Sequence, residues 1–174
     1  MEKTLNDDLN RLTVADFKSS EKHPLVVVLD NIRSFHNVGS AFRTCDAFKI
    51  SRLYLCGYTP TPPHRDIYKT ALGATESVDW SYLPTTIAAI EELKQQGYQV
   101  FAIEQALPHV YLQDFKPQDK IAFVFGSEVG GVDEAVLKEC DGCIEIPQWG
   151  TKHSINISVA LGIVLWDAVA KLNA

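Results

Sequence analysis

Five short apolar runs constrain the fold of this chain more than any other feature of its sequence. The first run, "LVVVL", is apolar at every position, as a strand covered on both faces must be. Helical patterns lie between the runs, and this alternation predicts an α/β fold with a mainly parallel sheet flanked by helices. The predicted strands cover 25–29, 52–56, 98–103, 121–125 and 143–146, and the predicted helices include 85–97, 132–140 and 156–172.

The length and composition fit one globular domain. The chain has 174 residues, which can bury a sizeable core, and 46% of them are hydrophobic. We divide it into a mostly polar N-terminal extension, residues 1–23, and one domain, residues 24–174. The sequence has no cleavable apolar leader and no apolar run of membrane-spanning length. We therefore expect a cytoplasmic protein without a membrane segment.

The four cysteines are expected to be reduced and mostly buried. Only Cys140 and Cys143 have ligand-like spacing, whereas Cys45 and Cys56 lie ten residues apart inside apolar segments. A tetrahedral zinc site usually needs two close pairs, so we expect no metal site.

The net charge of −6 argues against a protein that coats nucleic acid nonspecifically, because such binding comes from neutralised phosphates. A local basic patch remains compatible with this charge. The proline-rich connection at 59–75 carries three basic-type side chains, His64, Arg65 and Lys69. This connection is either a plain surface loop or a stiffened loop that follows a phosphate backbone.

Three polar clusters lie where a predicted strand meets a helix. They follow the strand at 25–29, form the glycine loop Gly126–Val132, and occupy Thr151–Asn156 before the last helix. Ligands bind at the carboxyl ends of parallel strands, so we expect the three clusters to meet in one site.

Each cluster, taken singly, also has a structural interpretation. Asn37 could cap a helix begun by Gly39, and Ser154 or Asn156 could cap the last helix. The glycines of the second cluster could serve only a tight turn. Arg43 lies either in solvent or half-buried, where it would need an anion.

The glycine loop is not a phosphate loop of a known kind. It lacks the Gly-Lys-Ser/Thr sequence and the G-x-G-x-x-G pattern, and Glu128 within it would repel a phosphate. A nucleotide-like ligand held there would therefore present no phosphate to the loop.

Three segments, in order, resemble the motifs of the SpoU (TrmH-like) branch of the SPOUT methyltransferases. Asn37-Val38-Gly39 with Arg43-Thr44 is similar to the first motif, "VFGSEVGGV" to the second, and "IPQWGTKHSINISVALGIVLWD" to the third. Members of this family methylate the ribose 2′-hydroxyl of RNA with S-adenosylmethionine. The resemblance implies this activity, this cofactor and an RNA partner, with tRNA favoured somewhat over rRNA because no appended RNA-binding domain is seen.

The resemblance also implies a C-terminal trefoil knot and a role for each motif residue. Ser154 and Asn156 would position the hydroxyl, and Arg43 would hold the adjacent phosphate or polarise the hydroxyl. The implied catalytic set is Arg43, Asn37, Glu128, Ser154 and Asn156. The implied cofactor-binding set is Ile103, Glu104, Gly126, Gly131, Ile146, Ser154 and Ile155. The basic residues expected to contact RNA are Arg33, His36, His64, Arg65, Lys69 and Lys152.

Two other functions stay open at this point. One is an RNA-binding module that keeps the fold without turnover. The other is an enzyme of flavodoxin-like architecture that binds a nucleotide phosphate at the glycine loop.

The last helix is apolar on two sides, which predicts an assembly. One stripe can face the sheet of its own chain, but the second would be left in water. The inner stripe is Ile157, Leu161, Val164, Leu165 and Ala168, and the outer stripe is Val159, Ile163 and Trp166. A second copy of the chain, related by a two-fold axis, would bury the outer stripe, so we predict a homodimer. The family resemblance also implies a homodimer, and it implies that each active site draws residues from both chains.

Replacing Arg43 with alanine should severely lower methyl transfer and leave cofactor binding nearly unchanged, because the guanidinium is assigned to the RNA. Transfer is measured with labelled cofactor and RNA, and cofactor affinity by calorimetry. An equal loss of cofactor affinity would refute the assignment.

Overall fold

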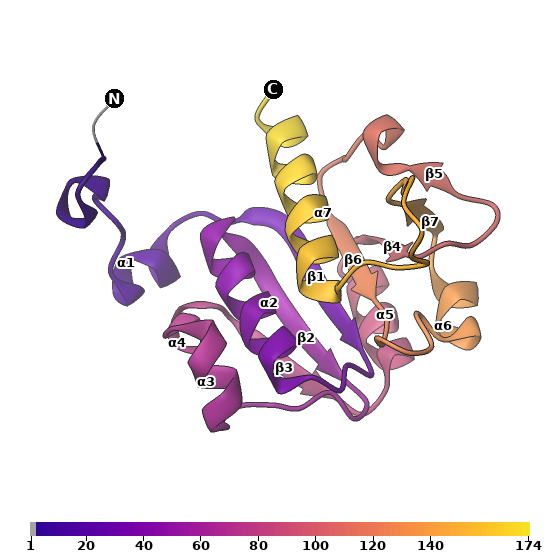
Figure 1. Cartoon of the computed structure of the whole chain (residues 1–174), viewed down its shortest axis with the longest axis horizontal. Helices are drawn as coiled ribbons and strands as arrows, with labels where there is room; N and C mark the ends of the chain where they lie inside the picture. The colour runs from indigo at the N-terminus through magenta and orange to yellow at the C-terminus, as the bar shows by residue number, and fades with distance from the viewer. Residues whose placement is uncertain (1–2) are drawn as a thin grey trace.

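The computed structural model describes residues 3–174, apart from the side chains of residues 6 and 7, and is built on one seven-stranded sheet (Figure 1). Every strand pairing is parallel, in the order β3-β2-β1-β6-β4-β7-β5, so the predicted parallel α/β architecture is confirmed. The strands are β1 His23–Asp30, β2 Ile50–Cys56, β3 Trp80–Leu83, β4 Gln99–Ile103, β5 Val110–Tyr111, β6 Ile121–Phe125 and β7 Gly142–Glu145.

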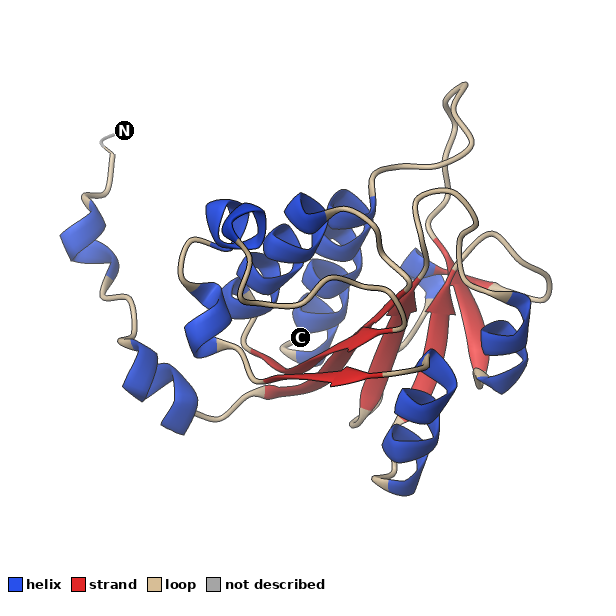
Figure 2. Ribbon diagram, turned by 90° about the horizontal axis from the view of Figure 1, so that it is seen from below, coloured by secondary structure: helices blue, strands red, loops and turns tan. Residues whose placement is uncertain are grey.

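Helices cover both faces of the sheet (Figure 2). One face carries α2 Phe35–Ala47, α3 Arg65–Ala71, α4 Ala74–Ser77 and α7 Ile157–Leu172, and the other carries α5 Thr86–Gln95 and α6 Glu134–Glu139. The helix α1, Val14–Ser19, precedes β1, and two 3-10 turns lie at Asn6–Leu9 and Leu112–Asp114. No helix of residues 3–174 is long and apolar enough to cross a membrane.

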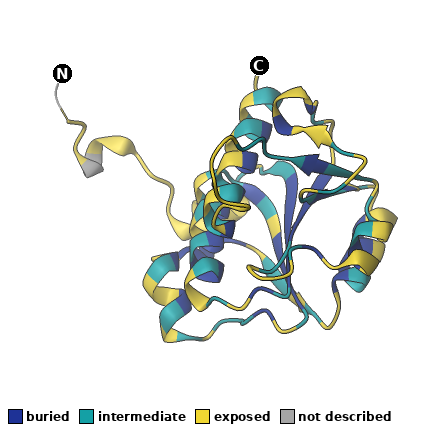
Figure 3. Cartoon of the chain, turned by 45° about the vertical axis from the view of Figure 1, so that its right-hand side comes forward, coloured by how far each residue is buried: buried dark blue, intermediate teal, exposed yellow. Residues whose placement is uncertain are grey.

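The central strand β1 shows why its sequence is apolar at every position. Leu25, Val27 and Leu29 pack in the cluster beneath α2 and α7, whereas Val26 and Val28 pack in the cluster that contains α5 and α6. All five side chains are at most 1% exposed (Figure 3). Both faces of the strand therefore exclude water, and neither could carry a polar residue without a buried partner.

Several elements differ from the sequence-based expectation. The edge strands β3 and β5 were not expected, because β3 mixes polar and aromatic residues and β5 has only two residues. The connection at 59–75 is also more ordered than a loop, since it forms α3 and α4. His64 caps α3 by accepting a hydrogen bond from the Asp66 backbone N–H, 3.2 Å away, so the helix begins directly after the prolines.

The two predicted stripes of α7 lie as expected. The five residues of the inner stripe are all buried in the core. In the outer stripe, Val159 is 52% exposed and Trp166 is 63% exposed. A water-exposed tryptophan and valine on one helix face form an apolar surface that the described part of the chain leaves uncovered.

Gly39→Ala should destabilise the fold, because α2 and α3 approach each other through this position. A Cβ atom there would collide with the Thr70 hydroxyl and with the Ile67 backbone carbonyl. The cost of overpacking, about 1–3 kcal/mol, should exceed the helix propensity of alanine, about 1 kcal/mol. Urea unfolding measures the change, and Ser40→Ala, which adds no atom to the same helix, should shift stability by less than about 0.5 kcal/mol. A Gly39→Ala protein as stable as the wild type would contradict this packing.

Candidate functional site

Three neighbouring strands end at one site. Phe125 of β6 pairs in register with Leu29 of β1 on one side and with Ile103 of β4 on the other. Beyond them, a cavity of about 670 Å³ is lined by the β4 end, the loop Gly126–Val132 and the segment before α7. The second and third polar clusters thus meet at the carboxyl edge of the sheet, where ligands of open α/β sheets bind.

Every residue that the resemblance assigned to the cofactor lines this cavity. The set includes apolar side chains and the glycines at either end of the loop: Ile103, Glu104, Gly126, Gly131, Ile146, Ser154 and Ile155. The structure therefore brings these residues together, while their part in cofactor binding stays a prediction.

Glu104 closes the glycine loop against the end of β4. Its Oε2 accepts a hydrogen bond from the Val132 backbone N–H at 3.0 Å, and the loop pairs with itself between Ser127 and Gly131. Gly131 has a φ of +66°, and a Cβ there would collide with the Glu104 carboxylate. Only glycine combines this conformation with such close approach.

A hydrogen-bonded chain of side chains joins the three motif segments. Asn37 Nδ2 donates to Glu128 Oε1 at 2.8 Å, and Asn156 Nδ2 donates to Asn37 Oδ1 at 3.3 Å. The Arg33 backbone N–H donates to Glu128 Oε2 at 3.3 Å. We name the chain Glu128–Asn37–Asn156 the motif network. It connects the loop after β6, the first turn of α2 and the start of α7.

The cap of α2 corrects one sequence interpretation. Helix α2 begins at Phe35, and Ser34 caps it by accepting from the Asn37 backbone N–H at 3.2 Å. Asn37 is therefore not the cap, and its amide is free to join the motif network. Asn156 does cap α7, since its side-chain oxygen accepts from the Ser158 backbone N–H at 2.8 Å, while its amide nitrogen bonds Asn37.

Glu128 is held as a carboxylate. Burial alone would raise its pKa, but the hydrogen bonds from the Asn37 amide and from backbone N–H groups, including that of Arg33, outweigh burial and lower the pKa. An ionised carboxylate only accepts hydrogen bonds, so it fixes which end of the Asn37 amide faces Asn156.

The charges around the cavity suit a cationic ligand. Among the described residues that line it are two carboxylates, Glu104 and Glu128, and one histidine, His153, but neither lysine nor arginine. Both carboxylates would repel a phosphate, which is the effect expected of Glu128 from the sequence. Gln105, which carried no motif signal, donates from Nε2 to the His153 carbonyl and ties the β4 end to the segment before α7.

Arg43 is not brought to the cavity of its own chain. It lies six residues after Asn37 on α2, a rotation of about 240° around the helix, and its side chain is exposed. Among the described side chains and backbone groups, its guanidinium finds neither a hydrogen-bond partner nor an ion pair. The predicted RNA-contacting residues also divide: Arg33, His36, His64, Arg65 and Lys69 lie on the loops and helices around α2 and α3, and Lys152 lies in the segment before α7.

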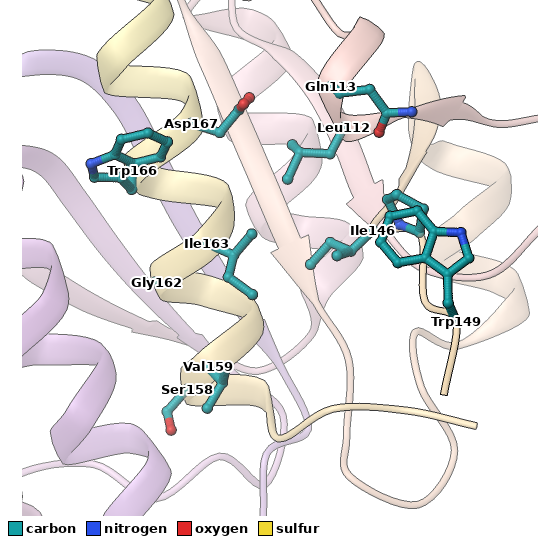
Figure 4. A pocket seen from close by; sticks show the side chains of 11 residues that line it. Leu112, Gln113, Ile146, Trp149, Ser158, Val159, Gly162, Ile163, Trp166 and Asp167 are labelled. Carbon is teal, nitrogen blue, oxygen red and sulfur yellow. The ribbon is translucent and has the colours of Figure 1, made fainter. Parts of the chain in front are cut away.

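A second cavity, of about 580 Å³, is lined largely by apolar side chains (Figure 4). Val159, Ile163 and Trp166 project from α7 on one side, and Leu112 and Trp149 stand across from them. Trp149 is 90% exposed. These side chains offer no reactive group, and in the described part of the chain no cluster of three His, Cys, Asp or Glu side chains could hold a metal ion.

Comparison with known proteins agrees with this architecture. The profile of the SpoU rRNA Methylase family matches residues 24–166. The 23S rRNA (guanosine-2'-O-)-methyltransferase RlmB of Vibrio parahaemolyticus is 30% identical over 161 residues, which are 92% of this chain and 65% of that protein. The chain therefore spans less than two thirds of the length of this curated relative.

Two solved structures share the fold. The A. aeolicus TrmH/SpoU tRNA modifying enzyme superposes with a TM-score of 0.82 at 25% identity, covering 92% of this chain and 81% of that one. The rRNA methyltransferase of Sinorhizobium meliloti, solved with AdoMet bound, superposes with a TM-score of 0.81 at 26% identity, covering 87% and 58%.

Asn37→Ala should raise the pKa of Glu128, because the side-chain hydrogen bond that lowers it is lost while burial remains. Carbon-13 NMR titration of the Glu128 carboxyl measures the change. In the wild type the folded pKa lies below the unfolded value of about 4.3, so the carboxylate stabilises the fold above that value. This stability is lost as the pH falls through the folded pKa.

Asn156→Ala is the matched control, because it removes the next link of the motif network and keeps the Asn37–Glu128 bond. Its Glu128 titration should stay close to that of the wild type. A titration unchanged in Asn37→Ala would contradict the network.

Proposed function

The chain belongs to the SpoU rRNA Methylase family, and from this premise we propose that it transfers a methyl group from S-adenosylmethionine to a ribose 2′-hydroxyl of RNA. The observation that carries the proposal is the motif network, which joins three segments beside one cavity. The name of the Vibrio parahaemolyticus relative supports 2′-O chemistry, and the AdoMet bound to the Sinorhizobium meliloti enzyme supports the cofactor.

The cavity fits S-adenosylmethionine in size and charge. Its volume of about 670 Å³ lies within the range of small-molecule sites, and the glycine loop lets backbone approach a ligand. When bound, the cofactor supplies an electrophilic methyl group on a sulfonium centre that carries no phosphate. Glu104 and Glu128 are compatible with that positive charge.

The residues of this chain would position the hydroxyl rather than react themselves. The Asn37 amide is held between Glu128 and Asn156, so its orientation is set before RNA arrives. Ser154 lines the cavity two residues before Asn156 and can offer its hydroxyl to the ribose. Such alignment behind the methyl group is the main contribution that a protein can make to a transfer of this kind.

The proposed assembly is a homodimer that buries the outer stripe of α7. The second cavity lies beside this stripe, and its apolar lining suits a second copy of the same surface. Arg43 points into solvent in its own chain, which supports its contribution to the site of a partner.

The trefoil knot and the cytoplasmic location also stay predictions. Residues 126–132 and 153–157 meet at one cavity, which is compatible with the knot.

Transfer of label from S-adenosylmethionine into RNA tests the activity. Both tRNA and rRNA are assayed, because the similar proteins named above include enzymes of each class. Labelled RNA that yields 2′-O-methyl nucleosides on digestion supports the proposal. Cofactor binding without label in any RNA, or RNA binding alone, would favour a module that has lost turnover.

Mixing inactive Arg43→Ala and Asn156→Ala proteins should restore part of the activity if each site takes these residues from different chains. Random exchange makes half of the dimers heterodimers with one intact site of two, so recovery of about one quarter of wild-type activity is expected. Confirmed heterodimers without activity would disprove the sharing of these residues, and a monomer in sedimentation would disprove the interface.

A further inference from the structure

Two pairs of stacked side chains bridge the segments that follow β1 and β2. The Arg33 guanidinium lies over the Tyr58 ring, 5.7 Å from its centroid. The Phe35 and His64 rings stack at 3.9 Å with an interplanar angle of 29°. Each pair takes one member from residues 31–36 and one from residues 57–64. We name these four residues the aromatic platform.

The backbone beneath the platform is rigidly tied. Thr59 is only 3% exposed. Its hydroxyl oxygen accepts from the Ile32 N–H at 3.0 Å, and its O–H donates to the Cys56 carbonyl at 2.6 Å, with the Leu29 carbonyl 3.2 Å away. Asn31 Oδ1 accepts from the Tyr58 backbone N–H at 3.2 Å. The two loops are thus held together before any ligand arrives, so little ordering entropy opposes binding.

The platform rings remain accessible to solvent despite this rigid support. Tyr58 is 57% exposed and Phe35 is 36% exposed. His64 Nδ1 accepts a hydrogen bond from the Asp66 backbone, which fixes the plane of the imidazole against Phe35. Flat rings on a rigid base, open to water, offer π-faces that a nucleobase can cover.

The surroundings of the platform are basic and continuous with the candidate site. His36, Arg65 and Lys69 are exposed nearby on α2 and α3, although Arg65 is partly neutralised by Asp66 at 3.4 Å. The backbone of Arg33 donates directly to Glu128 of the motif network. The platform and the network therefore adjoin, and an RNA strand whose ribose lies at the network can reach the platform.

We propose that the aromatic platform stacks an unpaired nucleobase of the RNA substrate. Bases in an A-form helix are stacked on each other and cannot cover protein rings, whereas unpaired bases can. The position of this base beside the acceptor ribose rests on the proposed function, but the stacking itself does not.

The test measures binding of a short fluorescein-labelled RNA oligonucleotide, alone and annealed to its complement. The wild type should prefer the unpaired form, and Tyr58→Ala should weaken that binding on the order of 10-fold. Tyr58→Phe keeps the ring and should bind like the wild type. The salt dependence should stay unchanged in Tyr58→Ala, because no charge is removed. Tyr111→Ala, an exposed tyrosine on the opposite edge strand, is the matched control and should have no effect.

The platform proposal would be overturned if the wild type bound the unpaired and the annealed RNA with equal affinity or bound neither. It would also be overturned if Tyr58→Ala bound the unpaired RNA as tightly as the wild type. A change of oligomeric state in Tyr58→Ala would instead assign the rings to a protein contact and overturn it too. Calorimetry with S-adenosylmethionine and the transfer assay are run on the same proteins. RNA binding that depends on the Tyr58 ring, without methyl transfer, supports the platform and refutes the proposed function. Methyl transfer with RNA binding that does not depend on the ring supports the proposed function and refutes the platform.

Discussion

The site depends above all on the hydrogen bond between the Asn37 amide and the Glu128 carboxylate. This contact, 2.8 Å long, joins residues that are 91 positions apart in the sequence. Because Glu128 stays ionised, it fixes the Asn37 amide, whose oxygen then holds Asn156 at the start of α7. Charge-assisted bonds are roughly twice as strong as neutral ones, so a single carboxylate can set the geometry of three segments.

The sheet makes this meeting possible. The strands β1, β6 and β4 are neighbours. Asp30, the last residue of β1, and Gly126 and Glu104, which directly follow β6 and β4, lead into the loops of the site. Asp30 is buried and accepts the Asp133 backbone N–H at 3.2 Å, which anchors the far end of the glycine loop. Glu104 also holds this end of the loop, because it accepts the backbone N–H of Val132, the last loop residue. The loop that carries Glu128 is thus held by carboxylates from the strands on either side.

The sequence predicts the central strands and the last helix, because continuous apolar runs and a helical apolar stripe leave a clear pattern. Seven residues that line the cavity were implied only by the resemblance of its motifs to the family. It does not predict β5 or α3, since two residues show no periodicity and the prolines of 59–63 conceal the helix that starts after them. The cap of α2 was misplaced because Ser34 and Asn37 are both good caps. The sequence marks Arg33 and His64 of the aromatic platform as basic-type side chains, but it does not predict the stacked pairs, because these form only when two separate segments are brought together.

A double-mutant cycle tests the motif network most directly. The kcat/KM of methyl transfer is measured for Asn37→Ala, Glu128→Ala and the double variant. If Glu128 acts through Asn37, the double variant should lose little more than the worse single variant, with a coupling of about 1 kcal/mol or more. Losses that multiply would mean that the two residues act independently, and would contradict the account.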